Sequence, residues 1–262
     1  MLKLGNLELD VPFFQAPLSG YTDRAMRILA KEFGAPLTFT GVLLDKIALH
    51  QQAVRKLGLA PGDDEHPVGA QILGADPGKM AMAAANFEQM GFDIIDLNFA
   101  CPAPKVLRRS RGGALMTDPG KIREIFLRVR DSVKCPVTMK LRIGHGNGDE
   151  NRQKFWQICE NASADGADAV VIHGRTVLEK YRGKANWQLL AEVKRQFPEM
   201  TVVGSGDMFE AEDIAEKLAE SRIDGVLIAR GAIGNPWLFQ QLRAVFEGTD
   251  EPACPNRLSR EK

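Results

Sequence analysis

Short apolar runs alternate with longer amphipathic segments along most of the chain. Each run is only a few residues long and is apolar at nearly every position. The eight runs span residues 11–17, 37–42, 68–73, 93–98, 136–142, 169–173, 201–205 and 225–229. A strand that is buried on both faces has this pattern, and such strands belong to parallel sheets.

The segments between the runs predict helices. Residues 76–90, 118–133, 149–165 and 209–220 have helical hydrophobic spacing, and 236–246 is expected to be the last helix. Asp76 and Asp118 each precede a proline, which places an N-cap residue directly before the first helical position. Gly91 and Gly166 stand where helix C-caps fall.

The number of strand and helix units favours a closed barrel. The run ends recur about every 30 residues, and eight units in about 230 residues match a (β/α)8 TIM barrel of the α/β class. A doubly wound open sheet, usually of about five or six strands, is the alternative. Residues 2–9 alternate around a tight turn and predict a short N-terminal β-hairpin. This hairpin is expected either to plug the N-terminal end of the barrel or to form a surface ribbon.

Composition excludes several classes of protein. The 262 residues are 44% hydrophobic and 26% charged, as in ordinary globular proteins. Lys plus Arg and Asp plus Glu are both 34, so any surface for nucleic acid must be local. The four cysteines form no CxxC pair, which argues against a zinc ribbon or a disulfide framework and for the cytoplasm. No apolar run approaches the ~20 residues that span a bilayer, so no membrane partner is expected.

In a barrel of this type the active site lies at the carboxyl ends of the strands. The residues at those ends include Pro17, Leu18, Ser19, Gln71, Asn98, Cys101, Lys140, His173, Arg175, Ser205, Gly206, Asp207, Ala229 and Arg230. The sequence has no HExxH motif, no acidic and histidine cluster with metal-ligand spacing, and no GxSxG elbow. The set therefore favours an anionic organic ligand over a metal ion.

The ends of the seventh and eighth runs predict a phosphate site. Ser205 ends one run and is followed by Gly206 and Asp207, and Ala229 ends the next run and is followed by Arg230. A phosphate site recurs at this place in the fold, and free backbone N–H groups with an arginine favour an anion. Tight turns alone are the alternative explanation for the glycines.

These strand ends resemble the tRNA-dihydrouridine synthase family of flavin mononucleotide (FMN) enzymes. The matching segments are residues 16–23, 98–105, 139–144, 173–176, 204–207 and 229–232, and they occur in the family's order. Asn98-x-x-Cys101-Pro102-x-x-Lys105 is the most specific of them. The resemblance implies a (β/α)8 barrel, FMN, NADPH (or NADH) as electron donor, and reduction of the uridine 5,6 double bond in tRNA.

The resemblance also suggests roles for individual residues. Cys101 is expected to donate a proton to uracil C5 after hydride reaches C6, because an unperturbed thiol is largely protonated at neutral pH. His173 is the next candidate for this proton. Asn98 is expected either to bind the uracil edge or to shape the loop. Cys135 and Cys159 are expected to be core residues.

Other strand-end residues are assigned to the flavin. Lys140 is expected near N1 and O2, where negative charge collects on reduction. Gln71 is expected to satisfy polar atoms of the ring through its amide, and His173 to lie beside the flavin or the substrate. The backbone of Pro17, Leu18 and Ser19 is expected to lie against the ring edge.

A basic surface is expected around the mouth of the site. Residues 97–117 contain no acid, yet they include Lys105, Arg108 and Arg109, and Arg175 follows the sixth run. Such loops suit contacts with tRNA phosphates, although a solvated loop is the ordinary alternative.

The organisation expected is a catalytic barrel over residues 1–247, followed at 248–262 by a linker and the start of a helical domain that the chain lacks. A monomer is expected. Three other functions stay open: an FMN oxidoreductase for a small pyrimidine, a flavin-free phosphate-binding barrel in which Lys140 forms a Schiff base, and an RNA-binding remnant with impaired catalysis.

Overall fold

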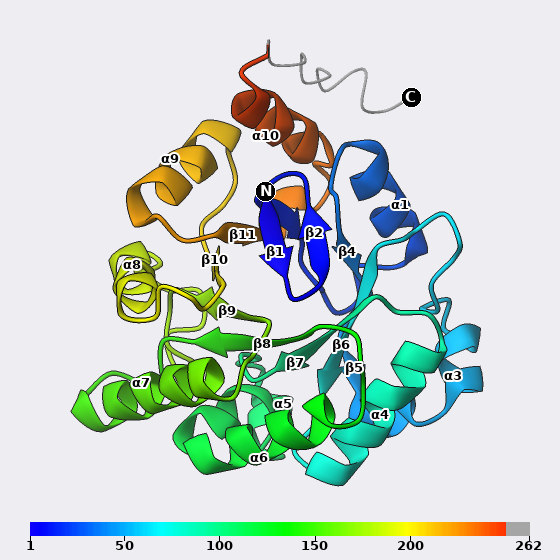
Figure 1. The fold of residues 1–262 in the computed structure, drawn as a ribbon, viewed down its shortest axis with the longest axis vertical. Coiled ribbons are helices and arrows are strands. Elements are labelled where there is room, and N and C mark those ends of the chain that lie inside the picture. Colours follow the sequence, from blue (N-terminus) through cyan, green and yellow to red (C-terminus); the bar gives the residue numbers. More distant parts are fainter. Residues whose placement is uncertain (250–262) are drawn as a thin grey trace.

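Parallel strands form a nearly closed barrel in the computed structural model, which describes residues 1–249 (Figure 1). The strands are β3 (Phe13–Gln15), β4 (Thr38–Phe39) with its continuation β5 (Leu43–Leu44), β6 (Val68–Leu73), β7 (Ile94–Asn98), β8 (Val137–Arg142), β9 (Ala169–His173), β10 (Val202–Ser205) and β11 (Gly225–Ile228). Their order is β3-β11-β10-β9-β8-β7-β6-β4, so neighbours in the chain are neighbours in the sheet. The amide of Gln15 donates to Leu37 O at 3.1 Å and links the two ends of this path. The predicted eight-stranded barrel is confirmed.

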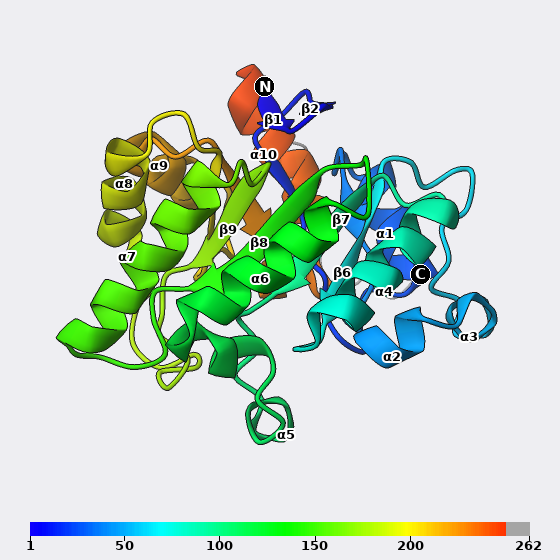
Figure 2. The same cartoon turned by 60° about the horizontal axis from the view of Figure 1, so that its bottom comes forward.

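Helices surround the barrel on the outside (Figures 1 and 2). They are α1 (Arg24–Glu32), α2 (Asp45–Ala48), α3 (Gln51–Lys56), α4 (Pro77–Gln89), α5 (Pro104–Leu107), α6 (Pro119–Arg130), α7 (Asp149–Ala164), α8 (Trp187–Gln196), α9 (Ala211–Ser221) and α10 (Trp237–Glu247). The predicted N-caps are confirmed, because Asp76 accepts from the amide of Lys79 and Asp118 from that of Lys121. Within residues 1–249, no helix is long and apolar enough to cross a bilayer.

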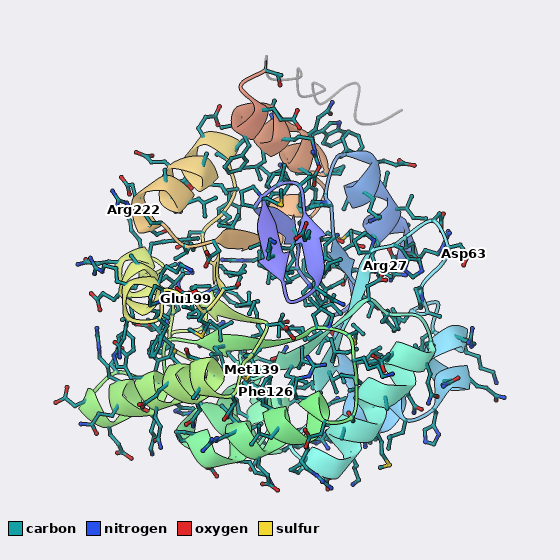
Figure 3. The ribbon with its side chains drawn as sticks, in the orientation of Figure 1. Arg27, Asp63, Phe126, Met139, Glu199 and Arg222 are labelled. Atoms are coloured by element: carbon teal, nitrogen blue, oxygen red, sulfur yellow. The ribbon has the colours of Figure 1, made fainter. Side chains whose placement is uncertain are left out.

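The strands alternate between two packing environments. Outward side chains such as Ile95, Leu97 and Met139 pack against the helices in one large core, which also includes Phe126 of α6 (Figure 3). Inward side chains near the amino ends of the strands form a second, smaller apolar core, which includes Phe14, Ile94, Ala169, Val171 and Leu227. Farther along the strands the inward positions become polar. The barrel interior is therefore apolar at one end and polar at the other.

The N-terminal hairpin closes the apolar end. Strands β1 (Leu2–Leu4) and β2 (Leu7–Leu9) pair antiparallel and lie across the barrel in Figure 1. Leu2, Leu4 and Leu9 are buried in the same core as the inward residues of the barrel. Gly5 has φ +62°, and a Cβ there would collide with Asp168, so this turn requires glycine. The hairpin is a plug and not a surface ribbon.

The second predicted strand is interrupted. The run at residues 37–42 forms only β4, and pairing with β6 resumes at β5. Between them the amide of Gly41 donates to Thr22 O at 3.2 Å, in the loop that follows β3. The chain therefore leaves the sheet to bind that loop, and Val42 reaches the cavity described below. Of the predicted linker at 248–262, residues 250–262 lie outside the described residues.

The plug gives a test of the hairpin's contribution to stability. Leu4→Ala is expected to lower the free energy of unfolding by about 2–5 kcal/mol, because it leaves a cavity in a fully buried site. Leu7→Ala, at a half-buried position of the same hairpin, is expected to lower it by less than half as much. Urea unfolding followed by circular dichroism measures both. Equal effects would contradict the role of Leu4 as the plug.

Candidate active site

The carboxyl ends of the strands surround a cavity of about 410 Å³, at the end of the barrel opposite the hairpin. This volume is in the range of small-molecule sites. Its lining includes Pro17, Leu18, Ser19, Gln71, Asn98, Cys101, Lys140, His173, Ser205, Gly206, Asp207, Ala229 and Arg230. The structure thus gathers every predicted catalytic and cofactor-binding residue around one space, where their roles remain predictions.

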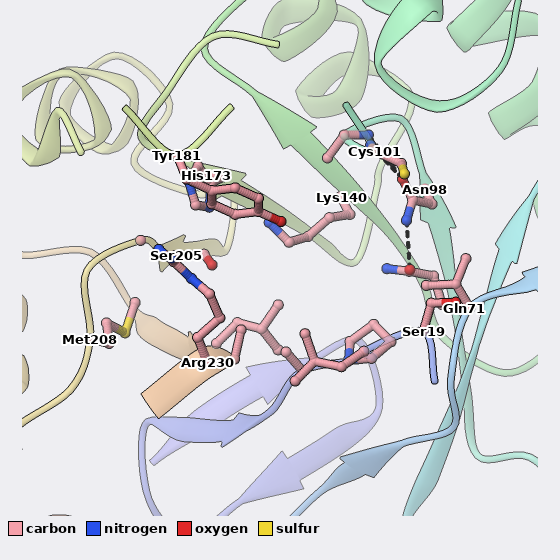
Figure 4. A pocket seen from close by; sticks show the side chains of 18 of the residues that line it. Ser19, Gln71, Asn98, Cys101, Lys140, His173, Tyr181, Ser205, Met208 and Arg230 are labelled. Carbon is pink, nitrogen blue, oxygen red and sulfur yellow. Dashed lines mark hydrogen bonds between the residues drawn. The ribbon is translucent and has the colours of Figure 1, made fainter. Parts of the chain in front are cut away.

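The loop that carries Cys101 is held by Asn98, the last residue of β7. Asn98 Oδ1 accepts from the amides of Ala100 (3.1 Å) and Cys101 (2.9 Å). The carbonyl of Cys101 accepts in turn from the amide of Gly113 at 3.0 Å. Of the two expected roles of Asn98, shaping the loop is the one with contacts in this structure. The half-buried Cys101 side chain lines the cavity beside it (Figure 4).

Lys140 extends into the middle of the cavity (Figure 4). Gln71, Asn98 and Cys101 lie on one side of it, and His173, Tyr181, Ser205 and Arg230 lie on the other. Burial and the nearby Arg142 cation lower the pKa of Lys140, and the Asp96 carboxylate opposes this effect. An anionic ligand in the cavity would therefore be attracted by Lys140 and would favour its charged form.

Arg142, at the end of the same strand as Lys140, also lines the cavity, and we assigned it no role from the sequence. Its Nε donates to Ala100 O at 2.9 Å, and its Nη1 donates to Thr176 O and Lys180 O at 2.9 and 2.8 Å. Burial lowers the pKa of Arg142 to about 10, so it is a cation at neutral pH. It ties the Cys101 loop to the loop after β9. Its spacing of two residues from Lys140 on one strand was the signal that could have revealed it.

The loops after β10 and β11 have the features of an anion cradle. Gly206 has φ +122°, and a Cβ there would lie 2.8 Å from that of Ala185. A Cβ on Gly231 would collide with the carbonyl of Met208. Within residues 1–249, the amides of Gly206, Asp207, Arg230 and Gly231 donate to no backbone carbonyl. The loops after β10 and β11 therefore bring small residues and unpaired N–H groups together at the predicted phosphate site.

The carboxylate of Asp207 would repel a phosphate if it were unpaired. Burial raises its pKa, but hydrogen bonds from Arg175 and the Ala185 amide, together with Arg230, outweigh burial and lower it. Arg175 Nη2 donates to both oxygens at 2.7 and 2.6 Å, and the Ala185 amide donates at 2.8 Å. The Asp207 carboxylate is thus neutralised by groups of the protein. The backbone amides of the cradle are the groups that face an incoming phosphate.

Arg175 does not lie where we expected it. It is only 2% exposed, and besides Asp207 it binds the carbonyls of Arg182 (3.0 Å) and Gly183 (2.5 Å). These hydrogen bonds occupy its buried guanidinium, which is therefore not exposed for contacts with RNA phosphates. By contrast, Lys105, Arg108 and Arg109 are exposed on and after α5. Figure 2 shows α5 protruding from the end of the barrel remote from the hairpin.

His173 is neutral in this site. Burial and the cations Lys140, Arg142, Arg175 and Arg230 lower its pKa to about 2. A neutral imidazole gives up a proton very reluctantly, so this lowered pKa argues against His173 as the alternative proton donor. Its ring lies 6.3 Å from that of Tyr181, which also stacks on Arg230 with 4.4 Å between guanidinium and ring centroid. No sequence pattern singled out Tyr181.

The structure is a (β/α)8 barrel with an anion cradle after β10 and β11 and a thiol after β7, which is the architecture of a barrel enzyme that binds a phosphorylated ligand. The chain matches the model of the dihydrouridine synthase family over residues 14–261. It is 36% identical to the "Probable tRNA-dihydrouridine synthase" of Rickettsia bellii, over 98% of this chain and 78% of that protein. It is 34% identical to the "tRNA-dihydrouridine synthase B" of Pasteurella multocida, over 94% of this chain and 73% of that protein. The chain belongs to the dihydrouridine synthase family.

Solved structures share the fold at lower identity. Histamine dehydrogenase from Rhizobium sp. 4-9 superposes with a TM-score of 0.68 at 17% identity, covering 94% of this chain and 47% of that one. A 2-naphthoyl-CoA reductase superposes with a TM-score of 0.71 at 17% identity, covering 95% of this chain and 52% of that one. This chain spans about half the length of each.

The neutral state of His173 predicts a pH dependence of stability. Below the ordinary pKa of 6.5 the unfolded chain takes up a proton that the folded protein rejects down to a pKa of about 2. Stability therefore falls as the pH falls, and between pH 7 and 5 this group contributes about 2 kcal/mol to the loss. His173→Gln is expected to remove that part of the pH dependence in urea unfolding. His50→Gln, at an exposed position, is the control; equal slopes for wild type and His173→Gln would contradict the neutral state.

Proposed function

We propose that this protein reduces the 5,6 double bond of a uridine in tRNA to dihydrouridine, with FMN in the cavity and NADPH (or NADH) as electron source. One observation carries the proposal. An anion cradle, a buried lysine and a cysteine thiol converge on a single cavity, from β10 and β11, β8 and the loop after β7. Membership of the dihydrouridine synthase family supports the same activity.

The residues present fit FMN. Its phosphate matches the unpaired amides of Gly206, Asp207 and Arg230 and the guanidinium of Arg230, in loops that tolerate little added bulk. Lys140 and the amide of Gln71 would contact the polar edge of the ring, and Pro17 to Ser19 its other edge. When bound, FMN supplies the hydride that adds to uracil C6.

In this proposal Cys101 gives the proton that C5 then requires. Asn98 and Gly113 fix its backbone at the cavity wall. The other thiols in residues 1–249 are unsuitable: burial raises the pKa of Cys135 to about 12 and that of Cys159 even higher, and neither lines the cavity. Cys101 is thus the one thiol among residues 1–249 that can act as a general acid in the cavity.

The basic residues on and after α5 favour RNA over a small pyrimidine as substrate. Lys105, Arg108 and Arg109 are exposed and belong to the segment that follows Cys101 in the chain. Cations at the mouth of the cavity would bind phosphates on either side of a uridine that enters it. Turnover of free uracil in preference to a tRNA transcript would favour the small-molecule alternative. Colourless purified protein would favour the flavin-free barrel, and tRNA binding without turnover would favour the RNA-binding remnant.

Arg230→Ala is expected to weaken FMN binding about tenfold, because it removes a charged partner of the phosphate. The FMN content of the purified protein and titration of the deflavinated protein measure this. Arg152→Ala, which removes an exposed arginine paired with Glu192 on the outer helices, is the control. Unchanged FMN affinity in Arg230→Ala would contradict the position of the phosphate.

Cys101→Ala is expected to bind FMN and to be reduced by NADPH like the wild type, since neither step uses the thiol. The reduced variant should be reoxidised by a tRNA transcript about 10²–10⁴ times more slowly, the usual effect of removing a general acid. Stopped-flow absorbance and mass spectrometry of the RNA follow the reaction. Cys135→Ala and Cys159→Ala should react normally. Dihydrouridine formed at the wild-type rate in Cys101→Ala would assign the proton to another group.

A further inference from the structure

A chain of buried hydrogen bonds connects the barrel interior with the Cys101 loop. Asp96, in the middle of β7, accepts from Thr138 Oγ1 at 2.6 Å and from Gln71 Nε2 at 2.5 Å. Gln71 Oε1 accepts from Asn98 Nδ2 at 2.7 Å, the bond drawn in Figure 4. Asn98 Oδ1 then receives the amides of Ala100 and Cys101. Asp96 itself does not line the cavity.

The direction of this chain follows from the chemistry of its first member. An ionised carboxylate can only accept hydrogen bonds, so Gln71 must turn its NH₂ group toward Asp96. The Gln71 oxygen then faces Asn98, so Asn98 must donate to it through its own NH₂ group. Only the oxygen of Asn98 remains for the two loop amides. Reversing the Asn98 amide would set donor against donor at the loop, and reversing the Gln71 amide would set donor against donor between Gln71 and Asn98.

We propose that Asp96 is a positioning residue, whose buried carboxylate fixes the orientation of the Gln71 and Asn98 amides and thereby holds the backbone of Cys101. Its importance for proton transfer rests on the function proposed above. The placement of the loop rests on the hydrogen bonds alone. Within residues 1–249, these three side chains leave no buried polar atom without a partner, in contrast to Gln15 on β3.

Asp96 occupies a position where a carboxylate is costly. It is 3% exposed, and burial raises its pKa, while its bonds to Thr138 and Gln71 and the Lys140 cation oppose the rise. An asparagine has the same shape and would avoid the burial of a charge. Asparagine, however, can present either an acceptor or a donor to Gln71, so it would not set the direction of the chain.

Amide hydrogen exchange tests the orientation directly in the purified FMN-bound protein. At pH 8, Asp96→Asn is expected to accelerate exchange at the amides of Ala100 and Cys101 about tenfold, the difference between a charged and a neutral partner. Thr138→Val removes the other partner of Asp96 and is as deeply buried, but it leaves the direction of Gln71 unchanged. It is expected to change exchange at these amides less than twofold. Equal effects of the two variants, or none in Asp96→Asn, would overturn the proposal.

Moving the carboxylate by one position gives a rescue. In the double variant Asp96→Asn with Gln71→Glu, the carboxylate at position 71 faces Asn98 directly and can only accept. The side-chain amide at position 96 can donate to this carboxylate. Exchange at Ala100 and Cys101 is expected to return to within about twofold of the wild type. Exchange as fast as in Asp96→Asn alone would show that direction is not what holds the loop. This variant keeps one buried carboxylate, so it serves also if Asp96→Asn does not fold.

The catalytic consequence is measured separately. Reduced Asp96→Asn is expected to be reoxidised by a tRNA transcript about tenfold more slowly, with tRNA affinity within twofold of the wild type. Normal reoxidation together with faster exchange would overturn the consequence for proton transfer. If the wild type itself formed no dihydrouridine, the proposed function would fail, while the exchange measurements would still decide the role of Asp96.

Discussion

The two-residue period of the barrel strands is the constraint on which the whole site depends. Because successive side chains point to opposite faces, each strand supplies apolar residues to the helices and a separate set to the interior. On β8 the outward residues Met139 and Leu141 are part of the outer core, while Thr138, Lys140 and Arg142 face inward. The hairpin seals the apolar end, so the polar residues have one opening to share.

Charge is concentrated at that opening although the chain as a whole is neutral. Lys140, Arg142 and Arg230 line the cavity, and Arg175 Nη1 lies 3.4 Å from Nε2 of the lining residue His173. The carboxylates near them, Asp96 and Asp207, are bound by hydrogen bonds from inside the protein. The remaining positive field favours an anionic ligand and holds His173 neutral. The proposed cofactor site and the proposed choice of proton donor thus have one electrostatic origin.

Much of this arrangement could be predicted from local patterns. The strand runs, the N-caps at Asp76 and Asp118, the small residues after β10 and β11 and the cysteine after β7 are all short-range features, and the structure places them as expected. The interruption at Gly41 could not be predicted, because it depends on a hydrogen bond to the loop after β3. The sequence also left open whether the hairpin plugs the barrel or forms a surface ribbon. The burial of Leu2, Leu4 and Leu9 in the inner core decides for the plug.

The sequence by itself determined which elements form and which residues stand at the strand ends, because propensity, hydrophobic period and glycine requirement act over a few neighbouring positions. Only the tertiary structure decided what those residues bind. Arg175 turns to Asp207, 32 residues away, and Asn98 turns inward to Gln71, 27 residues away. Arg142 spans two loops, and Asp96 orients side chains on two strands. Hydrogen-bond partners are chosen by proximity in space, and the barrel creates that proximity when it closes.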